Sequence, residues 1–430
     1  MIKNKIRKNQ KWLVVAILVL AGIAIGAVVG INHKKNRPVD ATDLSKGISA
    51  QRVEELADLQ PYHAQVTDFG IRLFQTAMKE GESTLLSPLS VISALAMTAN
   101  GAEGETLAQM EAVLGVPVEE LNAYLYTYLQ QLPEEEKYRL RLANSIWFAD
   151  KETFQVEKEF LQTNKNYYGA DVLKRTFDDG AVREINHWVE QKTDGMIEEI
   201  VQEIPEDAVM YLVNALAFEA EWQKVYEDRQ IRDAVFTLED GTKRTTELMY
   251  STEQTYLEDE LATGLVKYYK DGQYAFVALL PKEGVTVTEY VESLNGAHVQ
   301  ELLTGASNET VYAAIPKFET EYDTELSRVL SQMGMPLAFD VLQADFSGLG
   351  RDTRPEWNIY ISRVLHKTFI SVGEKGTKAG AVTAVEMAAN GSSGMPGQPK
   401  QVYLDRPFVY MLVDTKNNQP FFIGTLMDVE

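Results

Sequence analysis

Side chains that could perform covalent or metal chemistry are scarce in this sequence. None of its 430 residues is a cysteine, which excludes disulfides, thiolate metal ligands and cysteine nucleophiles. No two of its five histidines have the spacing of a helical metal site such as HExxH; they are His33, His63, His187, His298 and His366. We therefore expect neither a metal site nor a cofactor.

Motifs of a catalytic nucleophile or a nucleotide site do not occur either. The nearest approaches to the G-x-S-x-G nucleophile elbow, at residues 81–83 and 346–348, do not fit that pattern. Residues 348–350 (GLG) begin like a dinucleotide-binding loop, but the third glycine is missing. His366 precedes a strand-like run and is better explained as a hydrogen-bonded core histidine than as a general base. The chain is predicted not to be an enzyme, with an extracellular hydrolase as the weaker alternative.

Residues 377–388 alternate with a period of two and have mostly small side chains. One face holds Thr377, Ala379, Ala381, Thr383, Val385 and Met387. The run leads into residues 391–397, whose glycines and proline are typical of an exposed loop. Such a segment can be loop or strand, and an ordinary edge strand followed by a turn is the alternative interpretation.

This segment resembles the reactive-loop hinge of the serpin family. Residues 374–381 (EKGTKAGA) are similar to the family pattern E-[EK]-G-T-x-A-[AG]-A. The hinge positions are Glu374, Gly376, Thr377, Ala379, Gly380 and Ala381, and Thr383 continues the same face. Further serpin-like motifs follow in family order: residues 87–90 (SPLS) with Met97, 101–106 (GAEGET), 185–197 (INHWVEQKTDGMI), 213–222 (VNALAFEAEW), 315–318 (IPKF), 333–339 (MGMPLAF), 345–348 (DFSG), 407–408 (PF) and 421–424 (FFIG).

The resemblance implies inhibition by a suicide-substrate mechanism. A target protease attacks the exposed loop and forms an acyl-enzyme, and the cut hinge then inserts as a strand into the largest sheet before the ester is hydrolysed. The family's usual distance from the hinge places the scissile bond between Asn390 and Gly391, with Met387, Ala388 and Ala389 as alternatives.

The residues around this bond imply a class of protease. They are small, and no Lys or Arg lies between Val382 and Gln398, so an elastase-like or subtilisin-like serine protease is expected. The resemblance implies a covalent one-to-one complex with a monomeric inhibitor. A non-inhibitory serpin that acts as a binding or carrier protein is the alternative.

The resemblance also assigns roles away from the loop. Ser90, Asn214 and His366 are expected to form a polar cluster beneath the sheet where strands must part. Trp222 and Lys317, with Glu374, are expected where the hinge first enters. Thr377 is expected to be exposed in the uncut loop, and Gly380 to lower the strand propensity without abolishing insertion.

The N-terminus is predicted to export the chain. Five basic residues precede an uncharged apolar run at residues 12–31, which as a helix would span roughly 30 Å of bilayer. A retained anchor is favoured, and a cleaved signal peptide is the alternative because small residues at 21–27 could form a cleavage site. Fewer basic residues follow the run, so the domain is expected outside the cell, secreted or membrane-anchored. This leader and the lack of cysteine favour a bacterial source.

The remaining chain is interpreted as a linker and one domain. Residues 1–37 form the export segment, residues 38–60 a polar linker with a short helical pattern at 53–59, and residues 61–430 the serpin-like domain. The formal net charge of −22 argues against a nucleic-acid partner, because phosphate binding needs a clustered basic surface.

Patterning within the domain predicts an α+β fold. Helical periodicity appears at residues 66–77 and 91–99, the second preceded by the capping residue Ser87 and by Pro88. Strand-like runs dominate later, at residues 211–218, 274–280, 311–315, 369–372, 408–413 and 421–427. The resemblance implies the serpin fold, with a helix cluster, three mixed or antiparallel β-sheets and an exposed reactive loop near the C-terminus.

Overall fold

The computed structural model describes residues 41–132, 138–151, 153–205, 208–353, 358–377 and 398–429. Its helices are α2 (Gln60–Ala77), α3 (Pro88–Ala99), α4 (Gly104–Leu114), α5 (Val118–Gln131), α6 (Lys158–Tyr168), α7 (Asp179–Lys192), α8 (Val287–Ser293), α9 (Gly296–Thr304) and α10 (Ser327–Met333), with 3-10 turns η1 (Asp228–Gln230), η2 (Lys270–Gly272) and η3 (Pro336–Phe339). Its strands are β1 (Thr42–Asp43), β2 (Leu85–Leu86), β3 (Tyr138–Ala149), β4 (Phe154–Val156), β5 (Asp171–Arg175), β6 (Met210–Glu221), β7 (Ile231–Thr237), β8 (Lys243–Glu258), β9 (Ala262–Tyr268), β10 (Tyr274–Pro281), β11 (Ser307–Pro316), β12 (Phe318–Glu325), β13 (Gly350–Asp352), β14 (Arg363–Gly373), β15 (Gly376–Thr377), β16 (Lys400–Tyr403), β17 (Phe408–Asp414) and β18 (Gln419–Leu426).

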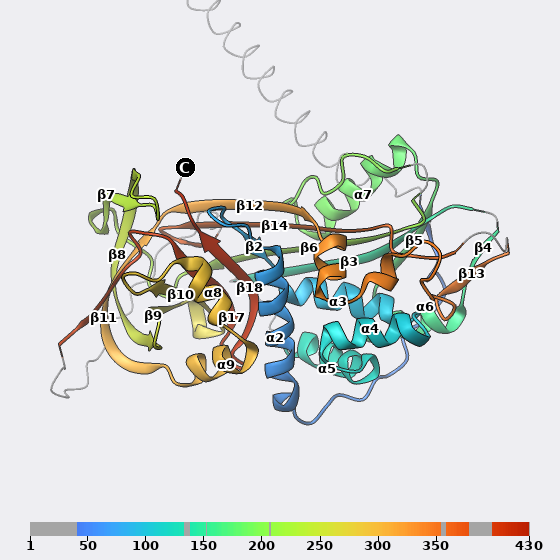
Figure 1. Ribbon diagram of the computed structural model, residues 1–430, viewed down its shortest axis with the longest axis horizontal. Coiled ribbons are helices and arrows are strands. Elements are labelled where there is room, and N and C mark those ends of the chain that lie inside the picture. Colours follow the sequence, from blue (N-terminus) through green and yellow to red (C-terminus); the bar gives the residue numbers. More distant parts are fainter. Residues whose placement is uncertain are drawn as a thin grey trace, which may run out of the picture. The chain divides into compact units, whose positions relative to one another are not determined.

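These strands form three sheets, two of them large (Figure 1). In the described part of the chain, a seven-stranded sheet has the order β1-β5-β3-β6-β15-β14-β12. A nine-stranded sheet follows β16-β11-β8-β9-β10-β17-β18-β2, with β7 paired to β8, and β4 and β13 form the two-stranded third sheet. Parallel pairs occur in both large sheets: β6 with β14 and β3 with β5 in the first, and β11 with β16 in the second. The predicted α+β class with mixed sheets is therefore confirmed.

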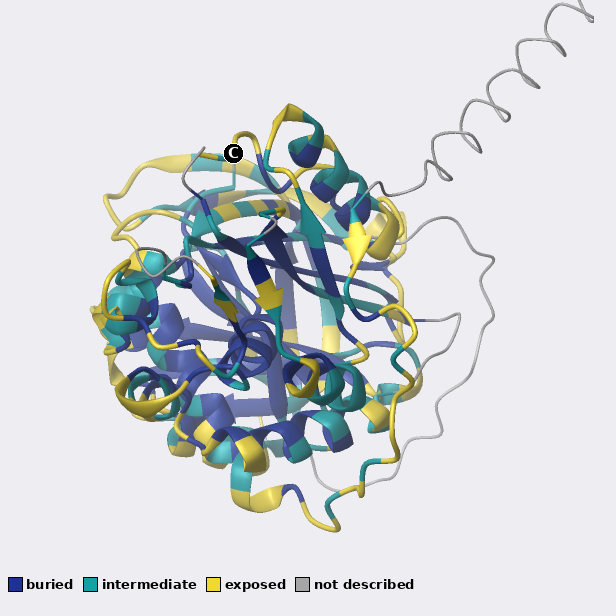
Figure 2. Cartoon of the chain, turned by 90° about the vertical axis from the view of Figure 1, so that its right-hand side faces the viewer, coloured by how far each residue is buried: buried dark blue, intermediate teal, exposed yellow. Residues whose placement is uncertain are grey.

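Helices cover both faces of the seven-stranded sheet. Figure 1 shows α7 on one side of its long strands and α3, α4 and α5 on the other. Ten of the twelve residues of β6 are buried, because a strand covered on both faces has no solvent side. In Figure 2 the buried residues gather in the central strands and the inner faces of the helices.

Local sequence rules account for where α3 begins. The Ser87 hydroxyl accepts a hydrogen bond from the Ser90 amide at 3.3 Å, and Pro88 occupies the first helical turn. The predicted start of this helix is confirmed. The first helix instead begins six residues before the predicted residue 66, at Gln60, with Pro61 in its first turn.

The described part of the expected linker, residues 41–60, lies against the domain. β1 pairs with β5 through Thr42↔Lys174 and Asp43↔Leu173, and Leu59 is buried. Residues 53–59 contain no helix, so the short helical pattern was misleading there. The domain boundaries at residues 37 and 60 stay predictions.

The membrane prediction concerns the apolar run near the N-terminus. Among the residues that it describes, no helix is long and apolar enough to cross a membrane. Residues 12–31, which carry the prediction, lie outside the described residues.

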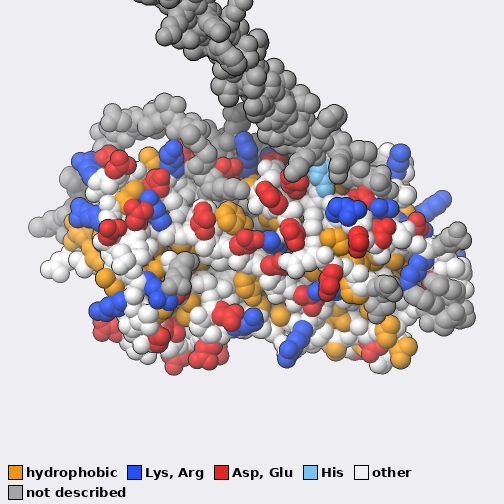
Figure 3. Space-filling view, turned by 90° about the horizontal axis from the view of Figure 1, so that it is seen from above, with side chains coloured by type: hydrophobic (Ala, Val, Ile, Leu, Met, Phe, Trp, Pro, Cys, Tyr) orange, Lys and Arg blue, Asp and Glu red, His pale blue; other side chains and the backbone are white. Residues whose placement is uncertain are grey.

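Charged side chains of both signs share the surface of the domain. On the face shown in Figure 3, Lys and Arg stand singly or in small groups among Asp and Glu. Where described side chains are visible on this face, they do not form the continuous basic patch on which phosphate backbones bind.

Candidate functional site

The reactive-loop hinge begins inside the seven-stranded sheet. β14 and β6 pair in parallel from Arg363↔Tyr211 to Phe369↔Ala217. Beyond those pairs β15 lies between the two strands and pairs antiparallel with both. The chain thus turns back after β14 and places the first residues of the loop where an inserted strand would begin.

Gly376 permits this turn. Its φ of +153° lies in a region that L side chains rarely adopt. A Cβ at this position would lie 2.0 Å from the carbonyl oxygen of Ala220 on β6. The glycine is therefore required by the close approach of β15 to β6.

The expected exposure of Thr377 is wrong. Thr377 is 0% exposed and faces Ala220 of β6 and Val372 of β14. Its Oγ1 lies 2.5 Å from the hydroxyl oxygen of Tyr269. The sequence predicted a strand face that could be buried, but only the packing shows that its first residue is buried before any cleavage.

Trp222 lies directly beneath this turn, consistent with its expected place near the hinge. Its indole Nε1 donates to the carbonyl oxygen of Gly373 at 2.8 Å, and its backbone amide donates to that of Lys375 at 2.8 Å. The indole stacks on the ring of Tyr269, with centroids 4.3 Å apart and planes inclined by 10°. The tryptophan thus holds both the turn and the tyrosine that contacts Thr377.

Lys317 joins the turn electrostatically. Its Nζ lies 3.0 Å from a carboxylate oxygen of Glu247 and 3.3 Å from one of Glu374. Partial burial lowers the pKa of Lys317, but the hydrogen bonds and charges of the two glutamates outweigh it and leave that pKa raised. The predicted trio of Trp222, Lys317 and Glu374 is brought together around the turn, and its role in insertion stays a prediction.

A buried ion pair under Trp222 was missed by the sequence analysis. Lys267 donates to Glu253 at 2.8 Å, and its Nζ lies 4.4 Å from the ring centroid of Tyr226 and 5.3 Å from that of Trp222. Burial lowers the pKa of Lys267, and the Glu253 carboxylate opposes that effect. A lysine as the single charged residue of β9 is the feature that could have indicated this pair.

Ser90, Asn214 and His366 meet beneath the sheet. The Ser87 amide donates to His366 Nε2 at 3.1 Å, so the ring proton is on Nδ1, which donates to Asn214 Oδ1 at 2.7 Å. Burial lowers the pKa of His366 to about 3, which keeps the ring neutral at physiological pH. This arrangement agrees with a core histidine, and nothing in it resembles a general base.

Asn214 connects this cluster to two more elements. Its Oδ1 accepts from the Ser90 hydroxyl, and its Nδ2 donates to the Ser90 carbonyl oxygen and to Asn144 Oδ1 on β3. The cluster therefore ties α3, β3, β6 and β14 together at the level where β6 and β14 are still paired. Its role in opening the sheet stays a prediction.

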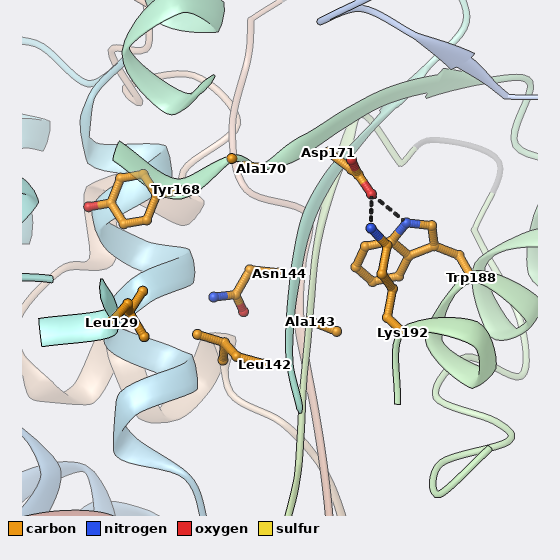
Figure 4. Close-up of a pocket in the computed structure, with 10 residues that line it drawn as sticks. Leu129, Leu142, Ala143, Asn144, Tyr168, Ala170, Asp171, Trp188 and Lys192 are labelled. Atoms are coloured by element: carbon orange, nitrogen blue, oxygen red, sulfur yellow. Dashed lines mark hydrogen bonds and ion pairs between the residues drawn. The ribbon is translucent and has the colours of Figure 1, made fainter. Parts of the chain in front are cut away.

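A small pocket of about 100 Å³ adjoins Asn144 (Figure 4). It is lined from α5, β3, the segment 168–171 and α7. On its wall, Asp171 accepts a hydrogen bond from Trp188 Nε1 at 2.9 Å and pairs with Lys192 Nζ at 2.8 Å. These contacts join α7 to the edge of the sheet, so the pocket is best explained as a packing gap between the sheet and the helices beside it.

The remaining predicted loop residues lie outside the described residues. They are Ala379, Gly380, Ala381, Thr383, Met387, Ala388, Ala389, Asn390 and Gly391. The scissile bond and the hinge positions after Thr377 therefore stay predictions.

Known proteins resemble this chain over most of its length. The family described as Serpin (serine protease inhibitor) matches residues 64–429. An uncharacterized serpin-like protein of Thermococcus kodakarensis is 29% identical, with 97% of this chain and 98% of that protein covered.

Solved structures agree with the sequence match. The thermophilic serpin tengpin in its native state is 46% identical with a TM-score of 0.86, covering 91% of this chain and all of that one. Human thyroxine-binding globulin in complex with its ligand shares the fold at 24% identity and a TM-score of 0.76, covering 86% of this chain and 99% of that one. The family match, the three sheets and the hinge geometry together show that this chain belongs to the serpin family.

Proposed function

We propose that this serpin inhibits serine proteases as a suicide substrate. The observation that carries the proposal is the position of β15, whose two residues already pair between β6 and β14. A chain that continues from Thr377 in the same register would add a full central strand. The first step of insertion therefore needs no rearrangement of the hinge.

The strand register of β15 predicts which residues an inserted loop would contact. Because Thr377 faces Ala220 and Val372, a strand continued from it would place Thr383 between Asn214 and His366. Thr383 would share the face of Thr377, since side chains alternate along a strand. Insertion would therefore break the Asn214–His366 hydrogen bond and offer a threonine hydroxyl to both residues.

The covalent step belongs to the target enzyme. Its serine oxygen attacks the carbonyl carbon of Asn390, the Asn390–Gly391 bond breaks, and the proton taken from the serine leaves with the Gly391 amine. The acyl ester then either is hydrolysed by water or is carried across the sheet by the inserting strand. Inhibition results when insertion is the faster process.

Mixing the purified protein with an elastase and a subtilisin tests this function. We expect an adduct that survives denaturing electrophoresis, together with a released C-terminal peptide that begins at Gly391. A peptide that begins one to three residues earlier would move the scissile bond to one of the alternative positions and would leave the proposed inhibition unaffected. Cleaved inhibitor without any adduct across such a panel would favour a non-inhibitory binding protein instead.

We also propose that the domain acts outside the cell, either secreted or anchored through residues 12–31. Support comes from the apolar run and its five preceding basic residues. Protease added to intact cells should degrade the domain, or the domain should be found in the medium. Recovery in the cytoplasmic fraction alone would contradict the proposal.

A further inference from the structure

The hinge is joined to the second large sheet by a pair of buried hydroxyl groups. Tyr269 follows β9 of the nine-stranded sheet, and its hydroxyl lies 2.5 Å from Oγ1 of Thr377 in the seven-stranded sheet. Both residues are 0% exposed. Each hydroxyl is therefore the partner that keeps the other from being buried unsatisfied.

Tyr269 is held rigidly in this position. Its ring stacks on Trp222 and meets the ring of Phe218 edge to face, with centroids 5.2 Å apart. Its backbone amide donates to the carbonyl oxygen of Tyr274 at 3.0 Å. Burial raises the pKa of Tyr269, so the hydroxyl stays protonated and keeps its hydrogen-bonding capacity at neutral pH. A fixed hydroxyl selects one position for the Thr377 side chain.

We propose that Tyr269 is a positioning residue that keeps Thr377 engaged in the sheet before cleavage and so favours insertion over hydrolysis. The effect on partitioning rests on the inhibitory function proposed above. The physical reason is that the first residue pair of a new strand is the least favourable to form. Ordering the chain costs conformational entropy before the hydrogen bonds of further pairs offset that cost. With Thr377 held in place, this step is complete before the protease arrives.

Tyr269→Phe tests the proposal because it removes the hydroxyl and keeps the stacked ring. In the uncut protein, we expect hydrogen exchange of the amides at 376–377 to become about fivefold faster, the change expected for one net hydrogen bond. In mixtures with protease, the number of inhibitor molecules consumed per trapped enzyme should rise by a similar factor.

Two further variants test whether the hydroxyls act on each other. Thr377→Val keeps the shape of the side chain and should reproduce the effect, while the double variant should be no worse than either single one. Thr377→Ser keeps the hydroxyl and should therefore behave like the parent protein. Tyr290→Phe is the matched control, since it removes the hydroxyl of another buried tyrosine, which donates to Asp259 at 2.9 Å in a different part of the fold. It should leave exchange at 376–377 unchanged.

The two proposals fail in different ways. Faster exchange in Tyr269→Phe without any adduct in the parent protein would keep the positioning role and overturn the inhibitory function. Normal adducts in the parent, with exchange and partitioning unchanged in Tyr269→Phe, would overturn the positioning role alone. Additive effects in the double variant would also overturn it.

Discussion

The space around the Thr377 side chain is filled on all sides, which limits what can replace it. Thr377→Arg must either bury a guanidinium without a partner, at a cost of several kcal/mol, or expel the hinge from the sheet. Expulsion breaks the pairing of only two residues and one hydroxyl contact, about 1–3 kcal/mol. We therefore expect a folded protein with slightly lower resistance to urea, which is cut by protease and forms little adduct.

Lys378→Arg is the control for this change. It places the same guanidinium one residue further along the chain, on a side chain that is predicted to point to the opposite face of the strand. It should trap protease as the parent does. Equal trapping by both variants would show that the register of the hinge is wrong.

His366 makes stability depend on pH. Its pKa is about 3 in the folded protein against 6.5 for an exposed histidine, so the unfolded chain binds an extra proton between these values. Stability is therefore lost as the pH falls below 6.5, by about 1.4 kcal/mol per unit and about 2 kcal/mol at pH 5. Urea unfolding at pH 7.5 and pH 5 should show this loss.

His366→Gln isolates this contribution. The variant has no titrating ring, so its stability should fall by about 2 kcal/mol less than that of the parent between the two pH values. Parallel pH profiles of parent and variant would mean that the ring is protonated in the folded state.

At the scale of elements, the proposed inhibition requires β6 and β14 to separate. Val213 and Leu365 are register partners on these strands and lie on the face opposite to Asn214 and His366. Because the chain has no cysteine of its own, Val213→Cys with Leu365→Cys would form one defined disulfide across the pair. The oxidised variant should be cleaved without forming an adduct, and a reducing agent should restore trapping.

A second cysteine pair provides the control for that experiment. Glu319 and Ser371 are partners on β12 and β14, which lie on the same side of the insertion point and need not part. A disulfide between cysteines at these positions should leave trapping unchanged in both redox states. Trapping by the oxidised Val213/Leu365 pair would mean that the loop inserts elsewhere or not at all.

For the whole molecule, the proposed mechanism requires that the uncut state be less stable than the cleaved one. Insertion replaces one parallel contact between β6 and β14 by two antiparallel ones, and each added backbone hydrogen bond contributes about 1 kcal/mol. Cleavage within the loop should therefore raise the unfolding temperature by at least about 10 °C, measured by circular dichroism. Cleavage of the Thr377→Arg variant should raise its unfolding temperature much less. An unfolding temperature of the parent protein that does not change on cleavage would exclude insertion.

Much of this architecture was predictable because it follows from local patterns. Ser87 and Pro88 predicted the start of α3, and the apolar runs predicted the cores of β6, β10, β11, β17 and β18. These signals depend on side-chain periodicity and caps, which act over a few residues. The period-two pattern of residues 377–388 likewise indicated a segment able to become a strand.

The sequence by itself therefore determined the resemblance to the family, the cores of several strands, the start of α3 and part of the hinge surroundings, namely Trp222, Lys317 and Glu374. Only the tertiary structure decided that Thr377 is already buried, that Tyr269 meets it, and that Lys267 is paired beneath Trp222. Tyr269 and Thr377 lie 108 positions apart in the chain, so no periodicity relates them. Whether a segment suited to both loop and strand enters a sheet depends on the space between β6 and β14, and that space exists only once distant strands have packed.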